Sequence, residues 1–512
     1  MAAKSFHFPT IGSRAAGVAT LLAIDDVSLP LRRNLCLYIT KPTVRAEPVL
    51  SPSRDNPAAP DYLETFFYGT VLHEDGRFRM WYYPTSVGAN PDWPAEIQAQ
   101  HAPLGNDLYC GPICYAESED GLNWVKPPLR QMRFKGSLEH NGIWLPTLMT
   151  ACATLLRDDE DPDPTRRYKL AYWYQDSLNY PDIPSFATAV SSDGLHWTVL
   201  DPRPTDQFIE HGSFYKHAGL YIVNGQSGGG HVGSESSAES GRQGIALVSP
   251  DFEHWVQEWA PSFLLPEPPD RAGRGLDRPY DQVHIGTGAR SYGNVAVGVY
   301  CIWHNQPVFS EISGDFGLVV SNDGLAFREP VKGHVFLAAD DSPAPLWDGR
   351  KLNTVLTQGN GILNVGDTTY LYHGRWRNAG DDNAGRYAEI ALATLPRDRW
   401  GALGVTPGRE EGAVWTAPVL LPEGGCALNL NADGVAGMAV EVADDRFTPL
   451  PGFSGDALGA AAGPDGLDCV VRWPQTSLGA LGGRTVRFRV HLRDTETMQA
   501  RLYAIYLRGC DP

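Results

Sequence analysis

The sequence predicts an all-β protein, built as a five-bladed β-propeller followed by a small β-sandwich domain. Three observations predict it. A corner motif with serine, aspartate and an aromatic residue recurs along the chain, alternating apolar runs precede each copy, and the composition changes near residue 408. The length of 512 residues exceeds one ordinary core, and 14 Trp and 21 Tyr with only 20% charged residues are typical of a sheet-rich globular protein.

The corner motif reads SEDGLNW from residue 118, SSDGLHW from 191, SPDFEHW from 249 and SNDGLAF from 321. Its aromatic residue, with Trp400 as a degenerate fifth copy, returns at intervals of roughly 60 to 70 residues. An Asp-Gly pair makes a tight turn, and the Asp side chain accepts hydrogen bonds from the backbone N–H groups ahead of it. The aromatic residue is expected to wedge between blades, and four aspartates are expected to be architectural: Asp120, Asp193, Asp251 and Asp323.

Each corner closes a unit of three to four strands. Runs of small, aromatic and β-branched residues with a period of two predict these strands. In chain order the first two strands of the five units are TFFYGTVL and RFRMWYYP, ACATLLRD and YKLAYWYQ, GSFYKH and GLYIVNGQ, GARSYG and VAVGVYCIWHN, and GILNVG and TTYLYHGRW. Five such units, each burying its faces against its neighbours, describe a propeller.

The predicted boundary between the domains lies near residue 405. Residues 1–405 are assigned to the propeller with an N-terminal lead-in, and residues 406–512 to the β-sandwich. The second segment has many Gly and Ala, few large aromatic residues, and alternating strands such as CALNLNAD and TVRFRVHL between turns. It holds no cluster of reactive residues, so we expect it to brace the propeller, with carbohydrate binding as the alternative.

Charge and composition exclude several partners. A formal net charge of -18 disfavours nucleic acid and anionic membranes, because both would be repelled. No stretch approaches the roughly 18 apolar residues of a membrane span, and the run GVATLLAI ends at Asp25 and Asp26, so no secretory signal is expected and the cytoplasm is the default location. Cys110 and Cys114 form a CxxxC without a second pair, so neither a metal nor another cofactor is expected. Homo-oligomerisation stays open.

The functional site is expected at the propeller axis, where the first strands of all blades converge. Before or within these strands stand Asp61 and Glu64, Glu210, and Asp281. The ends of the second strands return to the same face and add aromatic and polar groups, Trp303 among them. Aromatic faces stack on sugar rings and polar groups bond sugar hydroxyls. The expected substrate-binding residues are Tyr68, Trp81, Trp173, Gln175, His211, His284, His304, Gln358, His373, Arg375 and Trp376.

Paired carboxylates in an aromatic pocket suggest glycosyl transfer, because one can protonate the leaving oxygen while the other attacks or activates water. We expect Glu210 to be the general acid and Glu64 the nucleophile or base. Asp281 is expected to orient them or to tune the pKa of Glu210. His211 and His284 are interpreted as pocket residues rather than metal ligands.

The corner motif, the five units and the C-terminal sandwich resemble the five-bladed propeller glycoside hydrolases, the group that includes families 43, 32, 62, 68 and 130. Residues 20–400 carry the propeller resemblance, most clearly through FFYGTVLHEDGRFRMWYY and CYAESEDGLNWVKP, and the sandwich is similar to the accessory domain of family 32. The resemblance implies a carbohydrate substrate and an exo-acting hydrolase for a furanoside, such as an arabinofuranoside or a fructofuranoside.

The chain departs from the patterns of two of these families. The nucleophile segment and the Arg-Asp-Pro and Glu-Cys segments of family 32 do not occur at the corresponding places. Family 43 would carry aspartates in blades one and two, whereas Glu64 stands at the first place and blade two has no acid; Glu210 matches the blade-three glutamate. The exact family therefore stays open.

Two other functions fit parts of the pattern. Sialidases also carry a Ser-Asp-Trp repeat, but they need an arginine triad, for which the chain offers Arg375 with Arg278 and Arg290. A non-catalytic carbohydrate-binding propeller would carry five equivalent grooves. Here the blades differ most where their strands meet the axis, which favours one central site.

Overall fold

The fold was analysed in a computed structural model, which describes residues 4–92, 107–145, 150–174, 186–200, 204–205, 207, 209–226, 242–265, 281–306, 308–377 and 385–510. Within these ranges the chain forms β-strands and short 3-10 turns, and no helix is long and apolar enough to cross a membrane. The 3-10 turns are η2 Pro164–Arg166, η3 Phe309–Glu311, η4 Ala339–Asp341, η5 Val435–Gly437, η6 Gly455–Ala457 and η7 Leu478–Leu481.

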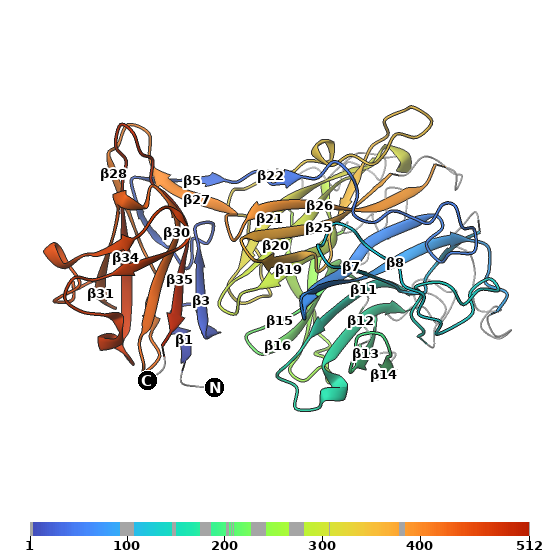
Figure 1. Cartoon of the computed structure of the whole chain (residues 1–512), viewed down its shortest axis with the longest axis horizontal. Coiled ribbons are helices and arrows are strands. Elements are labelled where there is room, and N and C mark those ends of the chain that lie inside the picture. The colour runs from blue at the N-terminus through green and yellow to red at the C-terminus, as the bar shows by residue number, and fades with distance from the viewer. Residues whose placement is uncertain are drawn as a thin grey trace.

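The strands gather into two bodies, a sandwich that contains the last strands of the chain and a ring of blades beside it (Figure 1). The ring has five blades, which confirms the predicted architecture. Blade one comprises β7 Glu64–Glu74, β8 Arg77–Val87, β9 Leu108–Cys110 and β10 Cys114–Ser118, and blade two comprises β11 Thr150–Arg157, β12 Tyr168–Tyr174, β13 Ala187–Ser191 and β14 Thr198–Val199. Blade three comprises β15 Glu210–His217, β16 Leu220–Gln226, β17 Gly244–Ser249 and β18 Ala260–Phe263, and blade four comprises β19 Asp281–Ser291, β20 Ala296–His304, β21 Ser313–Ser321 and β22 Val335–Leu337. Blade five comprises β23 Val355–Thr357, β24 Ile362–Val365, β25 Thr368–Arg377 and β26 Tyr387–Pro396.

The ring is closed by a strand from the opposite end of the chain. β6, Thr43–Val44, adds to the outer edge of blade five by antiparallel pairing of Val44 with Ala393. Blade five also meets blade one directly, because Ala388 of β26 pairs in parallel with Glu64 of β7. Strands distant in sequence thus complete the fifth blade.

A bulge interrupts the innermost strand of each of the first four blades. The ladder register breaks before Thr70, Thr154, Ser213 and Thr287, and each of these hydroxyl residues is buried. Thr70 donates to the carbonyl of Ala153 in the next blade, and Ser213 donates to that of Thr287. In blade five Asn360 takes the corresponding place and bonds the backbones of Val71, Leu155 and Phe214. These groups tie the inner strands together around the axis.

The four corner motifs are turns held by their own serine and aspartate, as the sequence predicted. In the second copy Asp193 accepts from the backbone N–H of Leu195 at 2.8 Å and of His196 at 2.9 Å. Asp120, Asp251 and Asp323 accept in the same way from the residues two and three places ahead. The pKa of Asp193 falls to about 2, because these donors and His196 outweigh its burial.

Each corner is also fastened to the blade before it. The carbonyls of Gly121, Gly194 and Gly324 accept from the hydroxyl of Tyr372, the indole of Trp81 and the hydroxyl of Tyr215, respectively. All three glycines have positive φ, between 75° and 78°. The motif aromatics pack at the same boundaries, since Trp255 contacts Phe186 of blade two and Trp124 contacts Tyr372 of blade five. The expected wedges between blades are therefore present.

The sandwich contains strands from both ends of the chain, which differs from the predicted division at residue 405. β1, β3, β4 and β5 pair with β29, β35, β28 and β27, so residues 5–39 belong to the sandwich sheet rather than to a propeller lead-in. The run GVATLLAI contains β3. The sandwich strands are β1 Ser5–Phe8, β2 Ser13–Ala16, β3 Val18–Leu22, β4 Leu31–Arg33, β5 Leu35–Ile39, β27 Gly401–Val405, β28 Glu411–Trp415, β29 Val419–Leu420, β30 Cys426–Asp433, β31 Met438–Asp444, β32 Gly459–Ala462, β33 Gly466–Arg472, β34 Thr485–Arg493 and β35 Arg501–Gly509.

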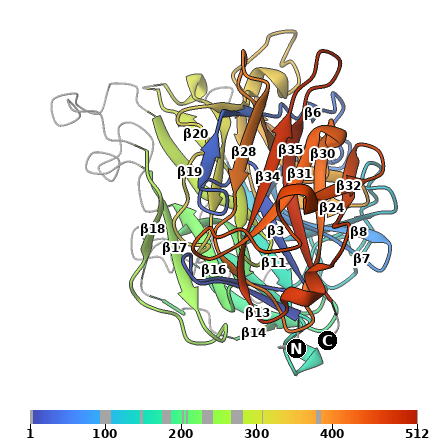
Figure 2. The same cartoon turned by 90° about the vertical axis from the view of Figure 1, so that its left-hand side faces the viewer.

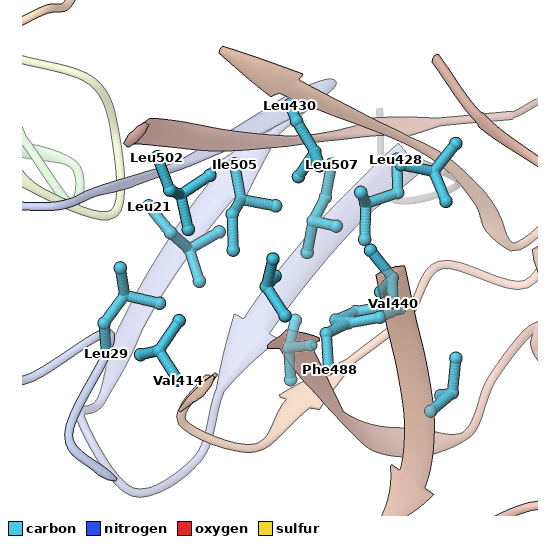
Figure 3. Packing of buried hydrophobic residues seen from close by; sticks show 14 of the residues in the cluster. Leu21, Leu29, Val414, Leu428, Leu430, Val440, Phe488, Leu502, Ile505 and Leu507 are labelled. Atoms are coloured by element: carbon cyan, nitrogen blue, oxygen red, sulfur yellow. The ribbon is translucent and has the colours of Figure 1, made fainter. Parts of the chain in front are cut away.

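One apolar core holds the two ends of the chain together. Leu21 and Leu29 from the N-terminal segment lie among Val414, Leu502 and other C-terminal side chains (Figure 3). The blue N-terminal strand β3 runs among the red C-terminal strands when the sandwich faces the viewer (Figure 2). The sandwich in turn packs on blade four, where Asn294 exchanges hydrogen bonds with the backbone of Thr20.

Candidate functional site

The candidate site lies at the end of the propeller where the innermost strands begin. Glu210, the first residue of β15, is half-buried there and accepts from Nε2 of Gln226 at 2.7 Å. Burial raises the pKa of the Glu210 carboxyl, while the charge of Arg242 and the Gln226 hydrogen bond partly oppose the rise. The group is therefore a carboxyl that holds a proton more readily than an ordinary glutamate.

Arg242, His284 and Tyr68 form a chain of hydrogen bonds beside this carboxyl. A guanidinium nitrogen of Arg242 lies 2.6 Å from Nδ1 of His284, and Nε2 of His284 lies 2.9 Å from the Tyr68 hydroxyl. A guanidinium only donates, so Nδ1 must accept and the neutral imidazole carries its hydrogen on Nε2. Burial and the adjacent Arg242 charge hold the pKa of His284 well below its usual range, which keeps the ring neutral, while the hydrogen bond from Arg242 selects this tautomer.

The tautomer decides what the Tyr68 hydroxyl can do. Because Nε2–H of His284 donates to it, the phenol oxygen accepts and its own hydrogen remains for another acceptor. The phenol keeps that hydrogen, since burial and then the charge of Glu210 raise the pKa of Tyr68 well above its usual value. Tyr68 is thus a hydrogen-bond donor close to Glu210.

Aromatic rings line the same region. The rings of Phe66 and Tyr83 stack with centroids 4.9 Å apart, and Tyr68 stacks on Tyr83 at 5.5 Å. Trp303 lies 4.4 Å from the His284 ring and 6.0 Å from Trp376. Four further aromatic side chains from blades one, four and five therefore lie beside the hydrogen-bonded chain, namely Phe66, Tyr83, Trp303 and Trp376.

Glu64, the first residue of β7, is the second carboxylate at this end. Its side chain is 1% exposed and accepts from the Thr85 hydroxyl at 2.7 Å, and Arg386 lies 3.5 Å away. The thiol of Cys110 connects it to Glu210: burial, aided by the charges of Glu64 and Glu210, raises the pKa of Cys110 to about 12. Both carboxyl groups stand on the first residue of an inner strand, β7 and β15, and so lie at the same end of the ring.

Asp281 does not join them. It is exposed and pairs with His304, whose other ring nitrogen lies 3.0 Å from Asp315. Hydrogen bonds from these two carboxylates raise the pKa of His304 to about 9. Asp281 stands three residues before His284 and so points to the opposite face of β19. The groups that act on the pKa of Glu210 are Arg242 and Gln226, not Asp281.

Several expected substrate-binding residues stabilise the blades instead. Trp81 is fully buried at the corner of blade two, and His211 bonds the carbonyl of Ala171 between blades. Gln358 donates to the carbonyls of His284 and Gly286, and His373 lies 2.8 Å from the Ser342 hydroxyl. Arg375 forms a buried ion pair with Glu389 at 2.6 Å. Burial lowers the pKa of His211 and of His373 to about 4.

The remaining expected residues divide differently. Tyr68, His284 and Trp376 lie in the site, and the half-buried Trp173 packs against the cluster that contains them. Gln175 lies outside the described residues. Of the arginines considered for a carboxylate-binding triad, Arg375 is paired with Glu389, Arg290 lies near the far end of β19, and Arg278 lies outside the described residues.

Three polar residues of the site were missed by the sequence analysis, namely Gln226, Arg242 and Arg386. Arg242 stands just before β17, the third strand of blade three. Arg386 stands just before β26, which is the third strand of blade five when β23 and β24, both paired with β25, are counted as one interrupted inner strand. In an antiparallel blade a third strand begins at the same end as the first. Residues just before third strands therefore lie at the site end of the blade, and this position is the sequence signal that identifies Arg242 and Arg386. Within the described ranges, no group of three or more His, Cys, Asp or Glu side chains could hold a metal ion.

Comparisons with known proteins concern the fold. No protein-family model matches the chain, and no curated protein matches its sequence. Similar solved structures include an N-acetylgalactosamine deacetylase from F. plautii in complex with blood group B trisaccharide (12% identity, 71% of this chain and 96% of that chain, TM-score 0.43). Others are a family 43 arabinoxylan arabinofuranohydrolase from Bacillus subtilis (10%, 90% and 99%, 0.35) and a family 32 β-fructofuranosidase from Bombyx mori (11%, 91% and 94%, 0.34). At these identities and TM-scores the similarity assigns neither a family nor a reaction to this chain.

Proposed function

We propose that the chain is a glycoside hydrolase, with Glu210 as general acid and Glu64 as its partner carboxylate. The observation that carries the proposal is the half-buried Glu210, whose pKa is raised by burial, at the same end of the ring as a second carboxylate, Glu64. A general acid must hold its proton at working pH, and a raised pKa secures this. The aromatic side chains around it suit the C–H faces of a sugar ring.

In this reaction Glu210 gives its proton to the glycosidic oxygen as the bond between that oxygen and the anomeric carbon breaks. Glu64 attacks the anomeric carbon or takes the proton of an attacking water. Tyr68, whose hydroxyl retains its hydrogen, donates to a sugar oxygen near the acid. We further propose exo action on a furanoside, as the family resemblance implies. NMR detection of the first-formed anomer distinguishes the two roles of Glu64, because a nucleophile retains the anomeric configuration and a base inverts it.

The test compares Glu210→Gln with the wild type on aryl furanosides of different leaving groups. Loss of the acid should lower the rate by about 10² to 10⁴ on poor leaving groups, and by much less on nitrophenyl glycosides, which depart with little protonation. Asp281→Asn serves as the matched control, because this carboxylate lies on the other face of its strand. Equal losses on all leaving groups would remove Glu210 from the acid role. Sugar binding without turnover by the wild type would leave a carbohydrate-binding protein.

A further inference from the structure

An arginine-rich cluster borders Glu64 at the rim of blade five. It consists of Arg54, Arg377, Arg386 and the phenol ring of Tyr387. The guanidinium groups of Arg54 and Arg377 lie 5.7 Å and 5.0 Å from the centre of that ring. Arg54 donates to the backbone carbonyl of Arg386, whose own side chain lies 3.5 Å from Glu64. The cluster is therefore continuous with the proposed catalytic site.

The positive charge of this cluster exceeds the negative charge around it. Arg375 forms an ion pair with Glu389, and Arg386 forms one with Glu64. Among the residues that the structure describes, no carboxylate forms an ion pair with Arg54 or Arg377. Arg377 is 6% exposed, and its Nε and one terminal nitrogen donate to the neutral carbonyls of Gly385 and Pro345.

Two further observations indicate that the polar groups and the positive charge of the cluster are incompletely compensated. The Nε of Arg54 is buried without a hydrogen-bond partner among the described atoms. Burial, together with the charge of Arg54, lowers the pKa of Arg377, while Tyr387 and Glu389 partly oppose the decrease. A buried charge without a partner is costly, and its cost is recovered when an anion binds.

We infer that Arg54 and Arg377 form a subsite for a carboxylate borne by the sugar, so that the substrate is an acidic glycoside. The inference rests on the proposed glycoside hydrolase activity and changes its substrate from a neutral furanoside to a sugar that carries a carboxylate. The planar guanidinium fork matches a carboxylate with two parallel hydrogen bonds. A singly charged carboxylate is favoured over a doubly charged phosphate, because Glu64 and Glu210 lie in the same site and repel the larger charge more strongly. Tyr62, 5.8 Å from the Arg54 guanidinium, and Tyr387 add aromatic surface for the ring that carries the carboxylate.

The inference contrasts with the charge of the whole protein. A net charge of -18 opposes anionic glycans at long range. Salt screens that repulsion beyond roughly 10 Å, so contact with two guanidinium groups decides binding at the site itself.

The experiment measures binding, which does not depend on turnover. Full-length protein is titrated calorimetrically with two matched pairs of sugars, D-galacturonate with D-galactose and D-glucuronate with D-glucose. We expect at least one acidic sugar to bind about tenfold or more tightly than its neutral partner, a difference of about 1.4 kcal/mol. Arg54→Gln and Arg377→Gln should each remove most of that preference and leave binding of the neutral sugar unchanged.

Two controls keep the test decisive. Arg130→Gln removes an exposed guanidinium whose two hydrogen bonds go to Glu139, and it should change nothing. Arg54 is only half-buried, so its variant remains informative if Arg377→Gln folds poorly. Equal affinities within both pairs, or a preference that survives both substitutions, would overturn the subsite. Acceleration of glycoside cleavage by inorganic phosphate that depends on Arg54 would also overturn it, because the anion would then be a reactant.

The outcomes separate this inference from the proposed function. A preference for acidic sugars that depends on the arginines, without hydrolysis of any glycoside, would remove the reaction and keep the subsite. Glu210-dependent hydrolysis of neutral furanosides, without a preference for acidic sugars, would do the reverse.

Discussion

The two ends of a blade follow opposite rules. At the outer corners, four blades repeat one turn with the same serine and aspartate contacts, and three of them place a glycine carbonyl against an aromatic donor of the preceding blade. At the end where the inner strands begin, the blades differ: the five strands start with Glu64, Thr150, Glu210, Asp281 and Val355, and only blades one and three share a residue type there. Repetition marks the parts that assemble the ring, and divergence marks the part available for chemistry.

The largest effect is expected from breaking a corner. Trp255 is 6% exposed and packs on Phe186 of blade two at 5.0 Å, so Trp255→Ala should lower the free energy of unfolding by about 3 to 5 kcal/mol. The Trp197 side chain is only half-buried, so Trp197→Ala should lower the free energy of unfolding by less than the loss of a fully buried tryptophan. Chemical denaturation gives the loss, and kcat of the remaining folded enzyme should be unchanged. A lowered kcat at unchanged stability would place the corner in the site.

At the divergent end, Arg242→Met should impair catalysis with little loss of stability. The lost charged hydrogen bond to His284 should lower kcat/KM roughly tenfold to a hundredfold, because such bonds contribute about 1.5 to 3 kcal/mol. The charge of Arg242 lowers the pKa of Glu210, so its removal should raise that pKa further. The acid then keeps its proton to higher pH, and the alkaline limb of the kcat/KM profile should move upward.

Arg242→Lys is the matched variant for this experiment. It retains a positive charge and should return the alkaline limb toward the wild-type position. A limb that stays in place or moves downward in Arg242→Met would mean that Arg242 does not act on the general acid.

A smaller effect is expected from the corner aspartates, and it depends on pH. The folded-state pKa of Asp193 is about 2, below its usual range, so Asp193 stabilises the fold when it is ionised. Asp193→Ala should cost about 0.5 to 2 kcal/mol near neutral pH, like the loss of a capping side chain. The difference from wild type should shrink as the pH falls from about 4 toward 2, because the carboxylate becomes protonated. A difference that persists at low pH would mean that its charge is unimportant.

The smallest effect is expected for Asp281→Asn. Its side chain is exposed and contacts His304 on the face opposite His284, so stability should change by no more than about 0.5 kcal/mol. Steady-state assays should show kcat/KM close to the wild-type value. A large loss of activity would mean that Asp281 takes part in catalysis, and that the face of β19 opposite His284 also belongs to the site.

Local pattern was enough to predict the blades. Period-two runs and Asp-Gly turns lie close together in sequence, and both report directly on local backbone geometry. Local pattern could not predict that residues 5–39 belong to the sandwich, because β3 pairs with β35 nearly five hundred residues later. An edge strand carries no local mark that identifies its partner.

The site was predicted less well, because it depends on which face of a strand a residue occupies. Tyr68, Glu210 and His284 were found from their place near the start of an inner strand. The bulges were missed, although their sequences repeat as YGT at 68, CAT at 152, HGS at 211 and IGT at 285, with QGN at 358 in blade five. A bulge shifts the alternation of side chains, so residues on either side of it face differently from what a simple count predicts. Arg242 and Arg386 needed the further step of inspecting third strands.

The pairing of the two chain ends has a consequence for biosynthesis. A ribosome makes β3 and β6 long before their partners, which are residues 504–508 and 393–394, respectively. Until then the early strands present open edges, and such edges attract other chains. Blades one to four can stack as they emerge, whereas the closure of blade five must wait until β26 has been made, and the sandwich must wait for β35. A nascent chain that stalls before residue 501 would expose apolar side chains such as Leu21 and Leu29, which makes stalled or truncated products the species most prone to aggregate.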